Sequence, residues 1–172
     1  MMSFIRAHGA DPGPTQRPYL AGSLTGLAAL IPAAVIFVAF GSFEVAADEV
    51  MRLPPIATSA VLAAAFTVAG LLYGAVFQRL ANDKRAGWLL GLAYGFLLWV
   101  VAPIVVLPLI HGSAMAAGVA ATGFLVTFLV WGLLVGVLYP HVHRPLQARL
   151  EDASARRQRD ILTAGQRLLA RR

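Results

Sequence analysis

Four long stretches of this chain contain no Asp, Glu, Lys, Arg or His, at residues 18–43, 53–78, 86–110 and 112–140. A helix rises 1.5 Å per residue, so roughly 20 residues cross the ~30 Å hydrocarbon core of a bilayer. Backbone groups in lipid must be satisfied internally, which uninterrupted helices achieve. The pattern predicts an all-α membrane protein, a four-transmembrane-helix bundle with spans at about 19–42, 56–78, 87–110 and 116–139.

Composition favours the same class. Hydrophobic residues make up 59% of the chain and charged residues 13%, whereas globular chains carry about 25% charged residues. A water-soluble domain of 172 residues could not bury that much apolar surface. Val45-Ala46-Ala47 resembles a signal-peptide cleavage site. A cleaved signal peptide is a weaker interpretation, because the first uncharged run exceeds the roughly 7–15 residues of a signal core and Glu44 directly precedes that site.

The distribution of basic residues predicts the orientation. The segment 1–17 carries two arginines, the connection 79–85 carries three basic residues and the segment 141–172 carries eight arginines, which leaves Arg52 as the only one of 14 Lys and Arg residues on the other side. By the positive-inside rule both termini are cytoplasmic. We therefore divide the chain into a lead-in (1–17), a transmembrane domain (18–140) and a basic cytoplasmic helix or tail (141–172).

An internal duplication is suggested by two pairs of similar segments. AGSLTGLA at 21–28 matches AGWLLGLA at 86–93 in six of eight positions, and GLLYG at 70–74 matches GLLVG at 132–136 in four of five. The offsets are similar, 65 and 62 residues. The bundle is therefore expected to consist of two similar helical hairpins inserted in the same direction and related by a pseudo-twofold axis.

Glycines spaced four apart occur in every predicted span. Because lipid tails are as apolar as leucine, membrane helices associate where small residues let their backbones approach. We expect these glycines to form the helix-packing faces, all in the cytoplasmic half of the bundle: Gly22, Gly26, Gly70, Gly74, Gly87, Gly91, Gly95, Gly132 and Gly136.

Prolines mark the other half of the predicted spans. A proline inside a helix removes one hydrogen bond and clashes with the carbonyl four residues back, so Pro103 is expected to disturb the helix at Trp99. A bundle that is tightly packed in its cytoplasmic half and splayed in its outer half has room for an apolar ligand. The residues expected near this ligand are Pro32, Trp99, Pro103 and Pro108. The same prolines also suit packing against neighbouring helices or another subunit.

Nothing within the spans indicates catalysis. Ionisable groups at membrane depth mark proton or ion paths, and here there are none. The polar residues at this depth can bond to helix carbonyls or across an interface: Thr25, Thr67, Tyr73, Tyr94, Thr122 and Thr127. His111 lies at one face of the bilayer and His141 and His143 lie at the other, about 30 Å away, so His111 cannot share a haem iron with either. The sequence predicts no enzyme, catalytic residue, metal site or cofactor.

The basic segment after Pro140 is the strongest remaining signal. A basic, partly amphipathic helix suits the anionic cytoplasmic leaflet and equally suits docking on a partner subunit. Nucleic acid is not indicated, since no aromatic interleaving or binding motif accompanies the charge. The candidate contacts with lipid headgroups or a partner are His141, His143, Arg144, Arg149, Arg156, Arg157 and Arg159.

The segment AGWLLGLAYGFLLWVVAPIVVLPLIHG at 86–112, with the GFLVTFLVWGLL segment that follows, resembles small bacterial inner-membrane proteins of the YagU type. The resemblance covers about one helix plus that segment. It implies a bacterial inner-membrane protein without an assigned reaction, and it transfers no functional residues.

These observations predict a non-catalytic membrane protein that works by helix–helix association. It would be an accessory or structural subunit of a larger membrane complex, or a homo-oligomer. The alternative is a binder or carrier of a lipid-like or quinone-like apolar molecule in the periplasmic half of the bundle.

Overall fold

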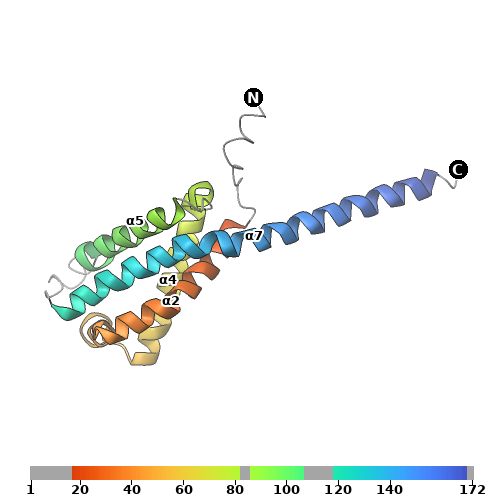
Figure 1. The fold of residues 1–172 in the computed structure, drawn as a ribbon. Helices are drawn as coiled ribbons and strands as arrows, with labels where there is room; N and C mark the ends of the chain where they lie inside the picture. Colours follow the sequence, from red (N-terminus) through yellow and green to blue (C-terminus); the bar gives the residue numbers. More distant parts are fainter. Residues whose placement is uncertain (1–16, 82–85, 107–117, 170–172) are drawn as a thin grey trace.

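The computed structural model describes residues 17–81, 86–106 and 118–169, and all of its regular elements there are helical (Figure 1). In chain order these are α2 (Pro18–Ala39), α3 (Ser42–Glu44), the π-helix η1 (Val45–Met51), α4 (Pro55–Ala81), α5 (Gly87–Trp99), the π-helix η2 (Val100–Val106) and α7 (Val119–Leu169). Pro108, most of the lead-in and the connections around residues 82–85 and 107–117 lie outside the described residues.

Three of the described helices are long and apolar enough to cross a membrane: Pro18–Ala39, Pro55–Phe77 and Val119–Arg149. They correspond to the first, second and fourth predicted spans. The predicted third span, 87–110, is described as far as residue 106, and its apolar part there is a shorter helix, Gly87–Ala102. The chain is therefore a helical, multi-pass membrane protein.

The distribution of side chains is that of a bundle immersed in lipid. Large aliphatic residues point outward along every long helix, among them Ile31 (72% exposed), Ile56 (86%) and Val76 (70%). The interior instead holds small residues and aromatic rings. Lipid tails solvate leucine and valine as well as a protein core does, so small residues are used where backbones meet.

Glycines hold α2 against α4. A Cβ atom on Gly70 would lie 2.5 Å from the Gly22 carbonyl oxygen and 2.7 Å from the Gly26 Cα, and a Cβ on Gly26 would lie 2.9 Å from the Gly70 Cα. Gly74 faces Gly22 and the Pro18 carbonyl in the same way. The two backbones thus touch at the end of the bundle where α2 and α5 begin and α4 finishes, which we call the glycine end. The opposite end is the α3 end.

The same contacts recur between α5 and α7. Gly132 faces Gly91 and Gly95 as Gly70 faces Gly22 and Gly26, and Gly95 meets the Phe128 carbonyl as Gly26 meets that of Phe66. Gly22 is therefore equivalent in packing to Gly91, not to Gly87 as the sequence match at 21–28 and 86–93 implies. Four residues are about one helical turn, so the sequence match pairs the first helices of the two hairpins one turn out of register.

The two hairpins meet unequally. α2 packs along α7 over much of its length, whereas α4 and α5 come close at few positions. An exact twofold axis would make these two contacts equal. The hairpins are alike internally, but their mutual arrangement departs from the symmetry that the duplication suggests.

Aromatic side chains join one hairpin to the other. Trp131 of α7 is fully buried and donates from Nε1 to the Gly26 carbonyl of α2 at 2.9 Å. The Tyr94 hydroxyl of α5 donates to the Ala69 carbonyl of α4 at 2.9 Å, and the Tyr73 hydroxyl of α4 donates to the Gly87 carbonyl at 3.3 Å. The Tyr73 and Tyr94 rings, 5.4 Å apart, fill the space that separates α4 from α5. Glycines close each hairpin, and aromatic hydrogen bonds connect the hairpins.

Proline has different consequences in different helices. α5 ends at Trp99 and continues as the π-helix η2, which contains Pro103, so the helix changes four residues before this proline, where the disturbance is expected. Pro32 lies within α2 without interrupting it. Pro140 and Pro145 likewise lie inside α7.

The helix α7 is much longer than a membrane span. Its 51 residues extend about 77 Å at 1.5 Å per residue. Val142 and Leu146 still pack against the core. Beyond them α7 leaves the bundle and continues roughly along the direction of its own packed part (Figure 1). The boundary predicted at residue 140 thus falls inside one continuous helix.

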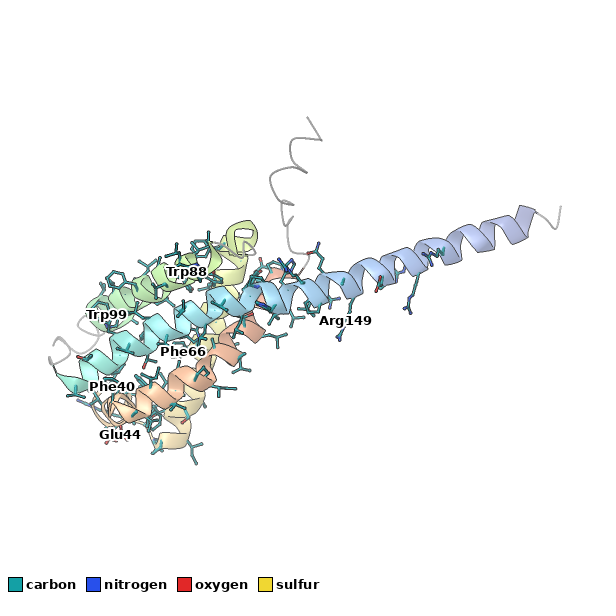
Figure 2. The ribbon with its side chains drawn as sticks, in the orientation of Figure 1. Phe40, Glu44, Phe66, Trp88, Trp99 and Arg149 are labelled. Carbon is teal, nitrogen blue, oxygen red and sulfur yellow. The ribbon has the colours of Figure 1, made fainter. Side chains whose placement is uncertain are left out.

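The first connection, 41–55, is mostly helical. Gly41 has a left-handed φ of 68°, which turns the chain after α2, and α3 and η1 then run to Met51. The Ser42 hydroxyl donates to the Ala120 carbonyl at 2.8 Å, tying this connection to the start of α7. Phe40 and Glu44 mark this end of the bundle in Figure 2.

Candidate functional site

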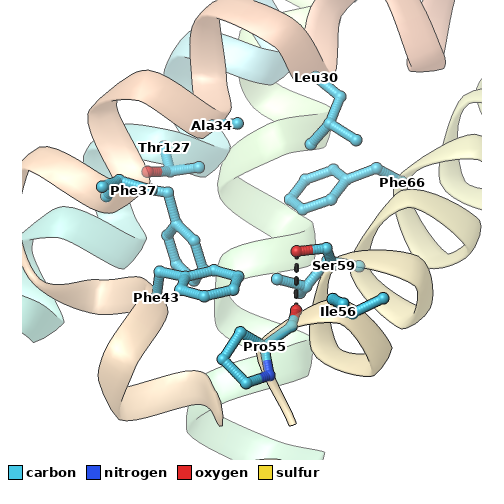
Figure 3. A pocket seen from close by; sticks show the side chains of 11 residues that line it. Leu30, Ala34, Phe37, Phe43, Pro55, Ile56, Ser59, Phe66 and Thr127 are labelled. Atoms are coloured by element: carbon cyan, nitrogen blue, oxygen red, sulfur yellow. Dashed lines mark hydrogen bonds between the residues drawn. The ribbon is translucent and has the colours of Figure 1, made fainter.

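A cavity of about 460 Å³ lies between α2 and α4 near the α3 end (Figure 3). The glycine contacts between these helices end at Gly26 and Phe66. In the following turns Leu30 and Leu62 take the place of glycine, and both line the cavity together with the small side chain of Ala34. The lining residues are Leu30, Ala34, Phe37, Val38, Phe43, Pro55, Ile56, Ser59, Leu62, Phe66 and Thr127.

The mouth of the cavity opens on the outer surface of the bundle. Two lining residues, Val38 on α2 and Ile56 on α4, are 54% and 86% exposed. The mouth thus lies on the exposed apolar surface that α2 and α4 share.

Only two lining residues carry a polar side chain. The Ser59 hydroxyl is exposed and donates to the Pro55 carbonyl at 2.9 Å, so its proton is already used. Thr127 of α7 is 1% exposed, and its Oγ1 has no hydrogen-bond partner among the described residues. The lining is thus apolar apart from these two hydroxyl-bearing residues.

Thr127 differs in this respect from the other threonines whose side chains are described. The hydroxyls of Thr25, Thr67 and Thr122 donate to the carbonyl four residues earlier, at 2.7, 2.7 and 3.1 Å. Thr58 donates to the Leu53 carbonyl at 3.3 Å. Sequence reasoning grouped Thr127 with Thr25, Thr67 and Thr122, since nothing in the sequence separates them. Only the packing around Thr127 does.

The four residues predicted to border an outer cavity lie elsewhere or are incompletely described. Pro32 is exposed on α2 and does not line the cavity. Trp99 packs instead on a small cluster that contains Phe37, Ala46 and Phe124. Pro103 is described only through its backbone in η2, and Pro108 lies outside the described residues. The sequence suggested space in this half of the bundle but not its position between α2 and α4.

The two histidines of α7 have different environments. His141 is exposed, and its Nδ1 lies 2.9 Å from the Val137 carbonyl oxygen. His143 is 2% exposed and stacks on the Tyr139 ring with centroids 6.1 Å apart. In the described ranges no group of three or more metal-ligating side chains could hold a metal ion. The burial of His143 and its stacking on Tyr139 make it part of the packing at the glycine end.

The predicted contact arginines are all exposed along α7: Arg144, Arg149, Arg156, Arg157 and Arg159. Arg149 lies where α7 has left the bundle (Figure 2). At 1.5 Å per residue, Arg157 lies about 16 Å along α7 from Leu146, which still packs on the core. The arginines are thus spread along a projecting helix.

The predicted packing glycines, by contrast, are brought together within the chain. Gly22, Gly26, Gly70 and Gly74 face one another, as do Gly91, Gly95, Gly132 and Gly136, while the Gly87 carbonyl meets Gly136. These glycine faces thus pack against each other within the two hairpins, α2 with α4 and α5 with α7.

Comparison of the chain with known protein families, with curated proteins and with solved structures finds no match.

Proposed function

We propose that this protein crosses a bacterial inner membrane four times, with both termini in the cytoplasm, and works without catalysis by association. It is an accessory or structural subunit of a larger membrane complex, or a homo-oligomer. The observation that carries the proposal is the continuation of α7 beyond the bundle. The bacterial location rests on the resemblance to the YagU type.

Association requires a surface that the chain does not use for itself. The glycine faces are used within the hairpins, whereas the part of α7 after Leu146 projects from the bundle. Most helix stability in proteins comes from burying one face against a neighbour. Residues 147–169 nevertheless form a helix, with no other described element beside it in Figure 1. A partner that buries one side of this helix would account for it.

The direction of α7 favours a protein partner for its outer part. A helix that continues along the axis of its span leads away from the membrane instead of lying along it. Arg144 and Arg149, nearest the bundle, are close enough to contact anionic headgroups. Arg156, Arg157 and Arg159 lie further along and suit a second copy or another subunit.

Removing residues 148–172, which we call the arm of α7, is expected to abolish assembly. A chain ending at Gln147 keeps Leu146 and the whole packed core, so it should fold as the full chain does but lose its partner. The measurement is native mass in detergent, compared between the two lengths. A multiple of the chain's own mass identifies a homo-oligomer, and a co-purifying stoichiometric protein identifies an accessory role. Identical native masses for the two lengths would rule out the arm as the docking element.

The proposed orientation can be tested with single cysteines, because the chain contains none. Asp48 in η1 and Arg156 in α7 are both exposed. Asp48→Cys should react with a membrane-impermeant maleimide in intact spheroplasts, and Arg156→Cys should react only after lysis. The reverse pattern would contradict the orientation, and labelling of both sites in intact cells would contradict an odd number of spans between them.

The cavity favours a second candidate function, the binding of a lipid-like or quinone-like molecule. Its apolar lining and its mouth on the exposed apolar surface are the observations that support it.

A further inference from the structure

We propose that the arm of α7 packs on a different protein, in an apolar groove that carries one carboxylate facing Arg157. This rests on the proposed function, in which the arm is the docking element. It names the chemistry of the partner and excludes a second copy of this chain.

The arm carries an apolar stripe along one side. A helix turns about 100° per residue, so positions three and four apart share a face. The backbone of α7 is helical through Leu169, and seven positions from 146 to 168 are spaced by three or four residues throughout. They hold Leu146, Leu150, Ala153, Arg157, Ile161, Ala164 and Leu168, which we call the arm stripe. All but one of these residues are apolar, the pattern of a helix that buries this side against a partner.

The arm stripe continues the side of α7 that packs on the core. Leu146 packs there, and Tyr139, seven residues earlier, is fully buried. Seven residues are about two turns, so Tyr139, Leu146 and Ala153 follow one another along the same side. Ala153 is exposed, and no other described helix lies beside it (Figure 1). One face of α7 is thus packed as far as the bundle reaches and open at Ala153.

Arg157 is the one charged residue in the arm stripe, and its side chain is exposed. A guanidinium that is buried in an apolar contact loses its hydration, and a carboxylate compensates both its charge and its hydrogen bonds. A groove that covers the arm stripe therefore needs a carboxylate at this level. Arg156 lies about 100° around the helix from Arg157, so it can remain in water when the stripe is covered.

Symmetry argues against a second copy as the occupant of this face. Copies inserted into one membrane in the same orientation are related by an axis along the membrane normal, so their projecting arms run parallel. Equal residues then meet at equal levels, and a twofold pair places Arg157 against Arg157. Two guanidinium groups repel each other, most strongly where the contact excludes water. Arg157 thus favours a carboxylate-bearing partner and disfavours the chain itself.

Zero-length crosslinking tests the carboxylate. Lys84 is the only lysine of the chain, so Arg157→Lys in a Lys84→Arg background places a single lysine on the arm stripe. A carbodiimide joins an amine to a carboxylate in direct contact, and in native membranes this variant should form an adduct with an Asp or Glu of a different protein, assigned by mass spectrometry. Arg156→Lys in the same background is the matched control. It should give about tenfold less adduct, because an ion pair requires the two groups within ~4 Å.

Disulfide formation tests the exclusion of a second copy, since the chain contains no cysteine. Ala153→Cys reports contact between two arm stripes, and Ala148→Cys, which is also exposed but lies on the opposite side of the helix, is its control. With Arg157 present, neither should form a linked dimer in the membrane. Arg157→Leu completes the apolar stripe and should raise the Ala153→Cys dimer by about tenfold or more, with Ala148→Cys unchanged.

Truncation separates a failure of the docking role from a failure of the carboxylate groove. If the chain ending at Gln147 keeps the native mass of the full chain, the arm is not the docking element and both are contradicted. If truncation lowers the native mass, three results overturn the groove alone. These are equal adducts from Arg156→Lys and Arg157→Lys, an adduct between two copies of this chain, and an Ala153→Cys dimer that Arg157→Leu leaves unchanged.

Discussion

Replacing Gly91 by leucine is expected to destabilise the bundle by more than about 3 kcal/mol, since forcing even single methylenes into a packed site costs about 1–3 kcal/mol. A Cβ at this position would already lie 2.7 Å from the Gly136 amide nitrogen and 2.8 Å from the Gly136 Cα. These are backbone atoms, which cannot rotate away as a side chain can. Either α5 separates from α7 along the whole glycine contact or the hairpin fails to form.

The matched control for this prediction is Ala93→Leu, two residues further along α5. Ala93 is exposed, so the added atoms meet lipid instead of backbone and the stability should change little. Unfolding in increasing sodium dodecyl sulfate, followed by circular dichroism, measures both variants. Equal stability of Gly91→Leu and Ala93→Leu would show that the α5–α7 contact is not made as described. Gly70→Leu and the exposed Ala65→Leu repeat the comparison on α4.

Replacing Trp131 by alanine is expected to cost about 3–5 kcal/mol, the range for deleting a buried large aromatic side chain. Trp131 is fully buried against the rings of Phe66 and Tyr94, with centroids 5.2 and 6.2 Å away. Its removal leaves a cavity at the junction of the two hairpins and deletes the bond to the Gly26 carbonyl. Within each hairpin the glycine contacts remain, so the hairpins should loosen from each other before either one opens.

Trp88→Ala provides the control, because Trp88 of α5 is 43% exposed and faces outward. Both variants lose the same side chain, but only one loses internal packing. Stability in detergent is compared as before, and crosslinking between cysteines placed on α2 and α7 reports separation of the hairpins. A Trp131→Ala protein as stable as Trp88→Ala would contradict the role assigned to the junction.

Most of the fold follows from local properties of the sequence. Uncharged stretches of sufficient length form helices in a bilayer, because a single segment can hydrogen-bond all of its own backbone N–H and C=O groups only as a helix. Glycines spaced four apart lie on one face of a helix, so their use as packing faces was predictable from Gly22 and Gly26, or Gly132 and Gly136, without a structure. The change of helix type after Trp99 was likewise predictable, since Pro103 acts on the carbonyl four residues back.

Other features depend on which helices meet, and local rules do not contain that information. The sequence match pairs Gly22 with Gly87, but the packing pairs it with Gly91. Alanine, glycine and leucine repeat so often in these helices that a shift of one turn still aligns similar residues. The difference appears only when the partner helix selects the register through its own glycines.

The candidate site shows the same division. The sequence alone identified four threonine hydroxyls at membrane depth: Thr25, Thr67, Thr122 and Thr127. Any of these hydroxyls could have donated a hydrogen bond to a carbonyl of its own helix. The sequence by itself determined that the chain enters a membrane as helices with glycine faces. Only the tertiary structure decided that these faces pack within two hairpins, that α7 continues beyond them, and that Thr127, without a hydrogen-bond partner among the described residues, lies beside a cavity. The reason is physical: lipid selects helices one segment at a time, whereas register, cavities and unpaired groups arise from contacts between segments far apart in the chain.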